Sequence, residues 1–227
     1  MINKRHPVRA ALAAGAMLVS VLAASPAFAS DEQTLINHSV GTLQDLRHDK
    51  EFGNARSLLN RARAIMIAPR IFKAGFFFGG EGGQAVLLVR GAHGWSDPAF
   101  YQIASASFGL QIGAQESEMI MFVMTDRALN ALMRDKFKIG ANAGIAVATL
   151  GSTVEGATTG NVGADLIVWA SASGAYAGIS LDGSVIEPMH DGDAHYYGRP
   201  VTSSDIVMRH AVHAPGAATL VRAVDGM

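Results

Sequence analysis

The apolar positions divide the chain into a helical beginning and a sheet-rich remainder. A first helix is predicted over residues 32–47, because apolar residues recur there at helical spacing behind an acidic first turn, at Leu35, Ile36, Val40, Leu43 and Leu46. A shorter helix is expected over residues 55–63. It leads into the apolar run 64–68, which predicts a buried strand that Pro69 halts.

Beyond Phe72, short apolar runs separated by glycines are typical of a β-sheet. Strands are predicted over residues 86–90 and 118–124. The alternation changes phase between Ile103 and Phe108, which predicts a β-bulge at that point. The run Gly79-Gly80-Glu81-Gly82-Gly83 lacks the Gly-Lys-Ser/Thr ending of a phosphate-binding loop, so we expect the loop of a hairpin there. Asp182-Gly183, between two alternating apolar segments, predicts a type I′ hairpin turn.

Further helices are expected in the centre of the chain and near its end. Thr125 is the predicted N-cap of the central helix. Another helix is expected over residues 205–213, and a last short helical turn over residues 217–224. These elements predict an α+β fold in which a curved antiparallel β-sheet or partial barrel is flanked by N-terminal, central and C-terminal helices. Residues 30–227 are expected to form a single domain.

The first 29 residues have the pattern of a cleavable signal peptide. Basic residues Lys4, Arg5 and Arg9 precede an apolar stretch, which ends at the small-residue cleavage pattern Ala27-Phe28-Ala29. We therefore expect an exported protein, periplasmic or else secreted or peripherally membrane-associated. The chain contains no Cys, which excludes a lipoprotein anchor at the cleavage point, disulfides and thiolate chemistry.

Charge and motifs narrow the classes of function. Without residues 1–29, the chain keeps 15 basic and 19 acidic residues, a balance that does not favour a nucleic-acid partner. Motifs of serine hydrolases, zinc proteases, dinucleotide-binding domains and EF-hands are absent. A zinc site can be imagined from His190, Asp191, Asp193 and His195, and from His210 and His213 one helical turn apart. The chain has no Cys, and Asp191-Gly192-Asp193 favours a turn instead. We expect no cofactor, no metal and no enzymatic activity.

One stretch combines positive charge with a lack of acidic residues. Residues 54–73 carry five basic side chains and no acidic one: Arg56, Arg61, Arg63, Arg70 and Lys73. Basic side chains close to an anionic membrane contribute roughly 1 kcal/mol each to binding. The stretch is therefore the candidate site for anionic phospholipid. The alternative is a solvated helix face that only aids solubility.

Five short motifs stand in one order along residues 64–207. They are Ile65-x-Ile67-x-Pro69, Gly94-Trp95-Ser96-x-Pro98, Ser107-x-Gly109-x-Gln111-x-Gly113, Ser173-Gly174-x-x-x-Gly178-x-Ser180-x-x-Gly183 and Tyr196-Tyr197-Gly198. Together they resemble the SYLF domain family, whose members include bacterial exported proteins and eukaryotic proteins that link phosphoinositide membranes to actin. The family's usual Gly-Pro-x-Gly-Arg turn is altered here to Gly151-Ser152-Thr153-Val154-Glu155-Gly156.

The resemblance implies a non-enzymatic lipid-binding domain of the bacterial envelope. It would bind anionic phospholipid or phosphoinositide-like head groups reversibly, and the expected signal peptide makes cytoskeletal actin an unsuitable partner. The alternative is an envelope structural or protein-interaction module without a lipid ligand. Several motifs also have a structural interpretation: Trp95 as an apolar anchor, Gln111 as a buried hydrogen-bonding residue, and Gly198 as the C-cap of a helix that carries Tyr196 and Tyr197.

Overall fold

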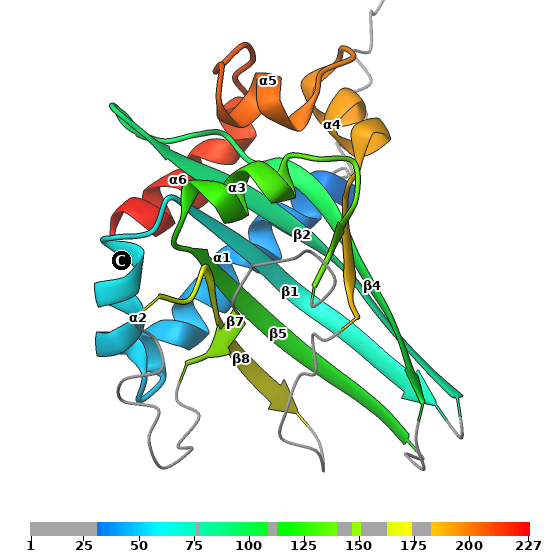
Figure 1. Cartoon of the computed structure of the whole chain (residues 1–227). Helices are drawn as coiled ribbons and strands as arrows, with labels where there is room; N and C mark the ends of the chain where they lie inside the picture. Colours follow the sequence, from blue (N-terminus) through cyan, green and yellow to red (C-terminus); the bar gives the residue numbers. More distant parts are fainter. Residues whose placement is uncertain (1–30, 76–77, 109–112, 140–146, 151–162, 174–182) are drawn as a thin grey trace, which may run out of the picture.

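A long, curved β-sheet forms the centre of the computed structural model (Figure 1). The model describes residues 31–75, 78–108, 113–139, 147–150, 163–173 and 183–227. The sheet order is β6-β9-β4-β2-β1-β5-β8-β7, with β3 paired to β2. The strands are β1 Ala64–Gly75, β2 Phe78–Gly91, β3 Gly94–Trp95, β4 Ala99–Phe108, β5 Gly113–Val123, β6 Phe137–Lys138, β7 Val147–Thr149, β8 Leu166–Ser173 and β9 Val185–Pro188. Among these pairings only β7–β8 is parallel.

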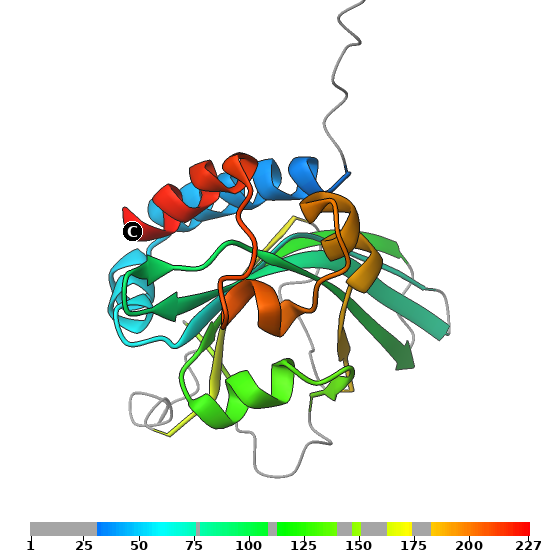
Figure 2. The same ribbon diagram turned by 90° about the horizontal axis from the view of Figure 1, so that it is seen from above.

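Helices lie on both faces of the curled sheet (Figure 2). They are α1 Asp31–His48, α2 Phe52–Leu59, α3 Asp126–Leu132, α4 His190–Tyr197, α5 Ser203–Val207 and α6 Ala218–Asp225, the last preceded by the 3-10 turn Pro215–Ala217. On the outer face, α1, α2 and α6 pack on one hydrophobic core. On the inner face, α3 and α5 pack on a second core. The predicted α+β class, with a half-barrel sheet and N-terminal, central and C-terminal helices, is confirmed.

The strand that was expected to stop at Pro69 continues to Gly75 as β1. Ile67 pairs with Val86 but Arg70 pairs with Gln84, so β1 has one extra residue opposite β2. The same shift occurs against β5, between Ala68 and Ile71. A β-bulge at Pro69 explains the continuation, because a bulged residue need not donate a ladder hydrogen bond.

The bulge also exchanges the two faces of β1. Before it, Ile65 and Ile67 belong to the outer core. After it, Ile71 belongs to the inner core instead. Because side chains alternate along a strand, Arg70 and Phe72 therefore lie on the outer face.

The glycine-rich run 79–83 is part of β2, so the expected hairpin loop was wrong. These residues pair with β1 on one side and β4 on the other. Gly83 is required by close approach, since a Cβ atom there would lie 2.3 Å from the Arg70 carbonyl oxygen. Gly83 thus lets β2 pass the bulge in β1.

The bulge expected in β4 was also wrong. Pairing between β2 and β4 runs without a register shift from Leu87–Ala99 to Phe78–Phe108. The change of apolar phase along β4 therefore occurs on a strand with regular pairing. The register shifts instead between β1 and its two neighbours, β2 and β5.

Two of the helix boundaries follow the capping signals that the sequence predicts. The Thr125 side chain accepts a hydrogen bond from the Ala128 amide, which confirms the predicted N-cap of α3. Gly198 ends α4 with φ +68°, as a left-handed C-cap. The helix expected over residues 205–213 ends at Val207, and three residues later His210 has φ +51°, a value incompatible with a right-handed helix.

Several predictions fall outside the described residues. These are the signal peptide, Gln111, the altered turn 151–156, and Asp182 with most of its hairpin.

Candidate functional site

The corner where α2 leads into β1 carries three of the five predicted site residues. Arg56 lies on α2, Arg61 follows the helix, and Arg63 directly precedes β1; all three are exposed. The Nε atom of Arg61 donates to the Ser57 carbonyl oxygen at 3.3 Å. Within the described ranges, neither Arg56 nor Arg61 forms an ion pair. We call these three residues the arginine corner.

Arg63 and Arg70 are each paired with an acidic residue from a distant part of the chain. Arg63 forms a bidentate ion pair with Asp126, in which both nitrogen–oxygen distances are 2.7 Å. The Asp126 pKa is lowered, chiefly by these hydrogen bonds. Arg70 Nε lies 2.8 Å from Glu116 Oε1 on the neighbouring strand.

Lys73 lies directly across from Glu81 in the β1–β2 ladder. Glu81 is only 8% exposed, and burial raises its pKa although the charge of Lys73 opposes this effect. The positive charge of Lys73 is thus partly balanced by a buried neighbour.

The five basic residues do not form one patch. Ten residues of extended chain separate Arg63 from Lys73, a span of roughly 30 Å. The pairing also places Arg70 on the outer face and Lys73 on the inner face. Of the five, Arg56, Arg61 and Arg63 lie closest together along the chain, at the junction of α2 and β1. Their role in lipid binding stays a prediction.

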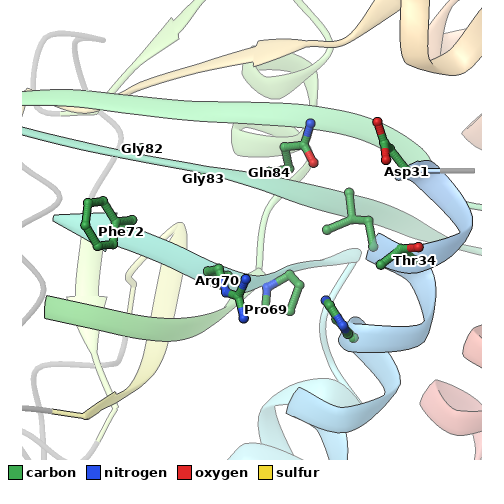
Figure 3. A pocket seen from close by; sticks show the side chains of 10 residues that line it. Asp31, Thr34, Pro69, Arg70, Phe72, Gly82, Gly83 and Gln84 are labelled. Carbon is green, nitrogen blue, oxygen red and sulfur yellow. The ribbon is translucent and has the colours of Figure 1, made fainter.

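A groove of about 380 Å³ lies on the outer face between the start of α1 and strands β1 and β2 (Figure 3). One wall is formed by Asp31, Thr34, Leu35 and His38 of α1. The opposite side is formed by residues of the two strands: Pro69, Arg70, Phe72, Gly82, Gly83 and Gln84. The bulge at Pro69 creates this groove by turning Arg70 and Phe72 to the outer face.

Phe72 is unusually exposed for an aromatic residue. Its exposed fraction is 51%, and Met208 is the other large apolar side chain that is comparably exposed in the described part of the chain. The ladder partners of Phe72 are Gly82 and Glu116, so one neighbour contributes no side chain. Sequence reasoning did not select Phe72, because the face it occupies depends on the bulge.

The Tyr196-Tyr197 motif and Asp193 hold α4 against the sheet. The Tyr196 ring packs edge-on against Phe100 with a centroid distance of 5.1 Å. The Tyr197 hydroxyl donates to the Pro98 carbonyl oxygen at 2.7 Å. Asp193 is fully buried and accepts the Phe100 amide hydrogen bond at 2.8 Å. The motif is therefore structural, as its packing interpretation predicted.

The turn expected at Asp191-Gly192-Asp193 was wrong, because these residues lie within α4. Burial raises the pKa of Asp193 to about 7, and its hydrogen bonds only partly offset that effect. Across the described residues, no group of three or more His, Cys, Asp or Glu side chains is arranged to hold a metal ion.

Trp95 is buried, with Arg90 stacked over its ring at 4.3 Å from the centroid. Arg90 also donates to the Leu59 and Ala62 carbonyl oxygens, and so ties the end of α2 to β2. The predicted role of Trp95 as an apolar anchor is confirmed. None of the helices in the described ranges is both long and apolar enough to cross a membrane.

An α+β half-barrel with an exposed arginine corner and an open groove has the features of a binding domain. The Ysc84 family model, described as Las17-binding protein actin regulator, matches residues 104–227, and the chain belongs to this family. It is 27% identical to protein YSC84 of Saccharomyces cerevisiae over 172 residues, which is 74% of this chain and 36% of that protein.

Animal relatives give similar matches. The chain is 28% identical to the SH3 domain-containing YSC84-like protein 1 of Bos taurus over 170 residues, covering 74% of this chain and 50% of the relative. With the human protein of the same name, the identity is 28% over 152 residues, covering 66% and 44%. The chain thus spans about a third to a half of the length of these relatives. The description of the family refers to the binding of a protein, Las17, and to the regulation of actin.

Proposed function

We propose that this protein is a non-enzymatic domain of the bacterial envelope that binds anionic phospholipid surfaces reversibly. The observation that carries the proposal is the arginine corner, where Arg56 and Arg61 are exposed and lack acidic partners within the described residues. Arg63 adjoins them, and its ion pair with Asp126 is exposed on both sides. Such an ion pair contributes little to stability and can exchange its partner for a lipid phosphate.

Arg70 and Lys73 contribute less to this function, because each has an acidic neighbour and both lie farther along β1. The expected signal peptide supports a location outside the cytoplasm, periplasmic or at the envelope surface. The attachment is electrostatic and therefore reversible by salt.

The test is co-sedimentation of residues 30–227 with phosphatidylcholine vesicles that contain increasing fractions of phosphatidylglycerol. Binding is expected to rise with the anionic fraction and to fall between 50 and 500 mM salt, concentrations chosen to shorten the screening length from above 10 Å to below 5 Å, by order of magnitude. The double substitution R56E and R61E is expected to lower the affinity at least tenfold, on the basis of roughly 1 kcal/mol for each basic side chain.

A matched control carries the same change of charge elsewhere, at Arg134 and Lys138, which are also exposed. R134E and K138E together are expected to weaken binding much less. Equal losses for the two double variants would refute the arginine corner as the site. Binding that is independent of vesicle charge would refute the electrostatic proposal altogether.

A second candidate function is protein binding, favoured by the groove beside the exposed Phe72. LAS seventeen-binding protein 3 of Saccharomyces cerevisiae, 27% identical over 172 residues, is named for such an interaction. Pull-down from delipidated envelope extracts, compared between the unmodified chain and F72A, tests it. A partner that is lost with F72A and retained with R56E and R61E would assign the groove to protein binding.

A further inference from the structure

A second cavity, of about 310 Å³, lies where β3 meets α6 and the segment between α5 and the 3-10 turn. Its lining includes Trp95, Asp97, His210, Val212, His213 and Arg222. It shares no lining residue with the groove of Figure 3 and contains none of the five predicted basic residues. Its size lies at the lower end of the range of roughly 300–1,000 Å³ found for small-molecule sites.

The backbone at this cavity is strained at one residue. His210 has φ +51°, and no other non-glycine residue in the described part of the chain has a positive φ. A Cβ atom on Gly91 would lie 3.3 Å from His210 Nε2, so the imidazole packs closely over that glycine. Strained residues of this kind persist where the surrounding structure holds them, often at ligand sites.

Within the described residues, no hydrogen bond of the His210 side chain compensates for this strain. Among the described residues, neither of its ring nitrogens has a hydrogen-bond partner. The His210 side chain is exposed, so its ring nitrogens can bond water or a ligand at the cavity.

A buried carboxylate orients the second imidazole. The Asp97 side chain is 8% exposed, lies 2.8 Å from His213 Nδ1 and accepts the Ala214 amide hydrogen bond at 3.1 Å. This arrangement uses the Nδ1 atom of His213 and leaves its Nε2 atom available. Arg222 adds a guanidinium group from α6, which donates a long 3.4 Å hydrogen bond to the Thr219 hydroxyl.

These groups define the chemistry of a ligand. The His210 imidazole and the Arg222 guanidinium can donate to an anionic oxygen, and a guanidinium pairs with a carboxylate through two parallel hydrogen bonds. Asp97 places a negative charge in the same cavity, which disfavours a ligand with two negative charges. Trp95, Val212 and Val221 supply apolar walls. We propose that this cavity binds a small monocarboxylate with an apolar body, such as a medium-chain fatty acid.

The test is calorimetric titration of residues 30–227 with octanoate, with 1-octanol and inorganic phosphate as comparison ligands. Saturable binding of octanoate at one site is expected, with much weaker binding of the other two. The substitution R222Q is expected to lower octanoate affinity about tenfold, because one charge-assisted hydrogen-bonding group is lost. R209Q, which removes a neighbouring arginine outside the cavity lining, is the matched control and should leave affinity unchanged.

A second variant, at His210, distinguishes a ligand-binding role of this residue from a purely structural one. Glycine adopts φ +51° without strain, so H210G is expected to raise the melting temperature while it weakens octanoate binding. A purely structural His210 would not give this opposite pair of effects. Failure of the unmodified chain to bind octanoate, equal binding of octanol, or an unchanged affinity in R222Q would each overturn the proposal.

Discussion

Strand β1 is continuous (Figure 1), but its two halves differ in how deeply their side chains are buried. Residues 64–68 are completely buried, with helices packed against both faces of the sheet. Residues 70–73 alternate between exposed outer side chains and a more buried inner face. The Pro69 bulge separates them. The comparison shows that one extra residue in a ladder can convert a core strand into a strand with exposed side chains on its outer face.

The largest expected loss of stability is in the buried half of β1, residues 64–68. Ile67 is fully buried in the outer core, so I67A is expected to lower the free energy of unfolding by about 4 kcal/mol through lost burial and a residual cavity. F72A, in the open half, should cost less than about 1 kcal/mol because Phe72 is half exposed. Urea unfolding measures both. Similar losses at the two positions would show that Phe72 is buried in solution.

The next effect concerns the junction between the halves. G83A is expected to destabilise the protein by about 3 kcal/mol, because its Cβ would lie 2.3 Å from the Arg70 carbonyl oxygen and would displace the bulge. G80A is the control, since a Cβ there meets no atom within 4 Å. A tolerated G83A would contradict the close approach of β1 and β2 at the bulge.

A smaller effect is expected from buried Asp193, which should make the stability of the protein depend on pH. Asp193 accepts a hydrogen bond from Phe100, whose partner in β2 is Val86, opposite Ile67. Its raised pKa, about 7, means that the folded state binds the proton more tightly than the unfolded chain. This group's contribution to stability is therefore present at low pH and falls as the pH rises towards 7.

D193N should remove this pH dependence while its amide oxygen still accepts the Phe100 hydrogen bond. Relative to the unmodified chain, the variant is expected to gain roughly 2 kcal/mol in unfolding free energy between pH 5 and pH 7. Chemical unfolding at the two pH values measures the difference. A constant difference would show that Asp193 is already ionised at pH 5.

The smallest effect is expected in the open half, at the exposed pair of Arg70 and Glu116. E116Q should change the unfolding free energy by no more than about 0.5 kcal/mol, and the change should vanish in 1 M salt. Thermal unfolding at low and high salt checks this. A larger effect that persists in salt would mean that the pair is shielded from solvent.

Local sequence patterns were sufficient to predict those elements whose formation depends on neighbouring residues. The helical spacing of residues 32–47 predicted α1, since a helix that packs on a sheet needs an apolar stripe of that period. Thr125 and Gly198 predicted a helix start and a helix end, because both act on backbone groups within a few residues. Alternating apolar residues and glycines predicted the curved sheet, although not the role of the glycines within β2.

The candidate site depended on contacts that are distant in the sequence. The stretch 54–73 contains no acidic residue, yet Asp126, Glu116 and Glu81 approach three of its five cations from other elements. The cavity at Trp95, His210 and Arg222 draws on residues more than a hundred positions apart. The sequence alone thus determined the class of fold and the basic stretch. Only the tertiary structure decided which charges stay unpaired and which face Phe72 occupies, because pairing across strands and a one-residue bulge set both.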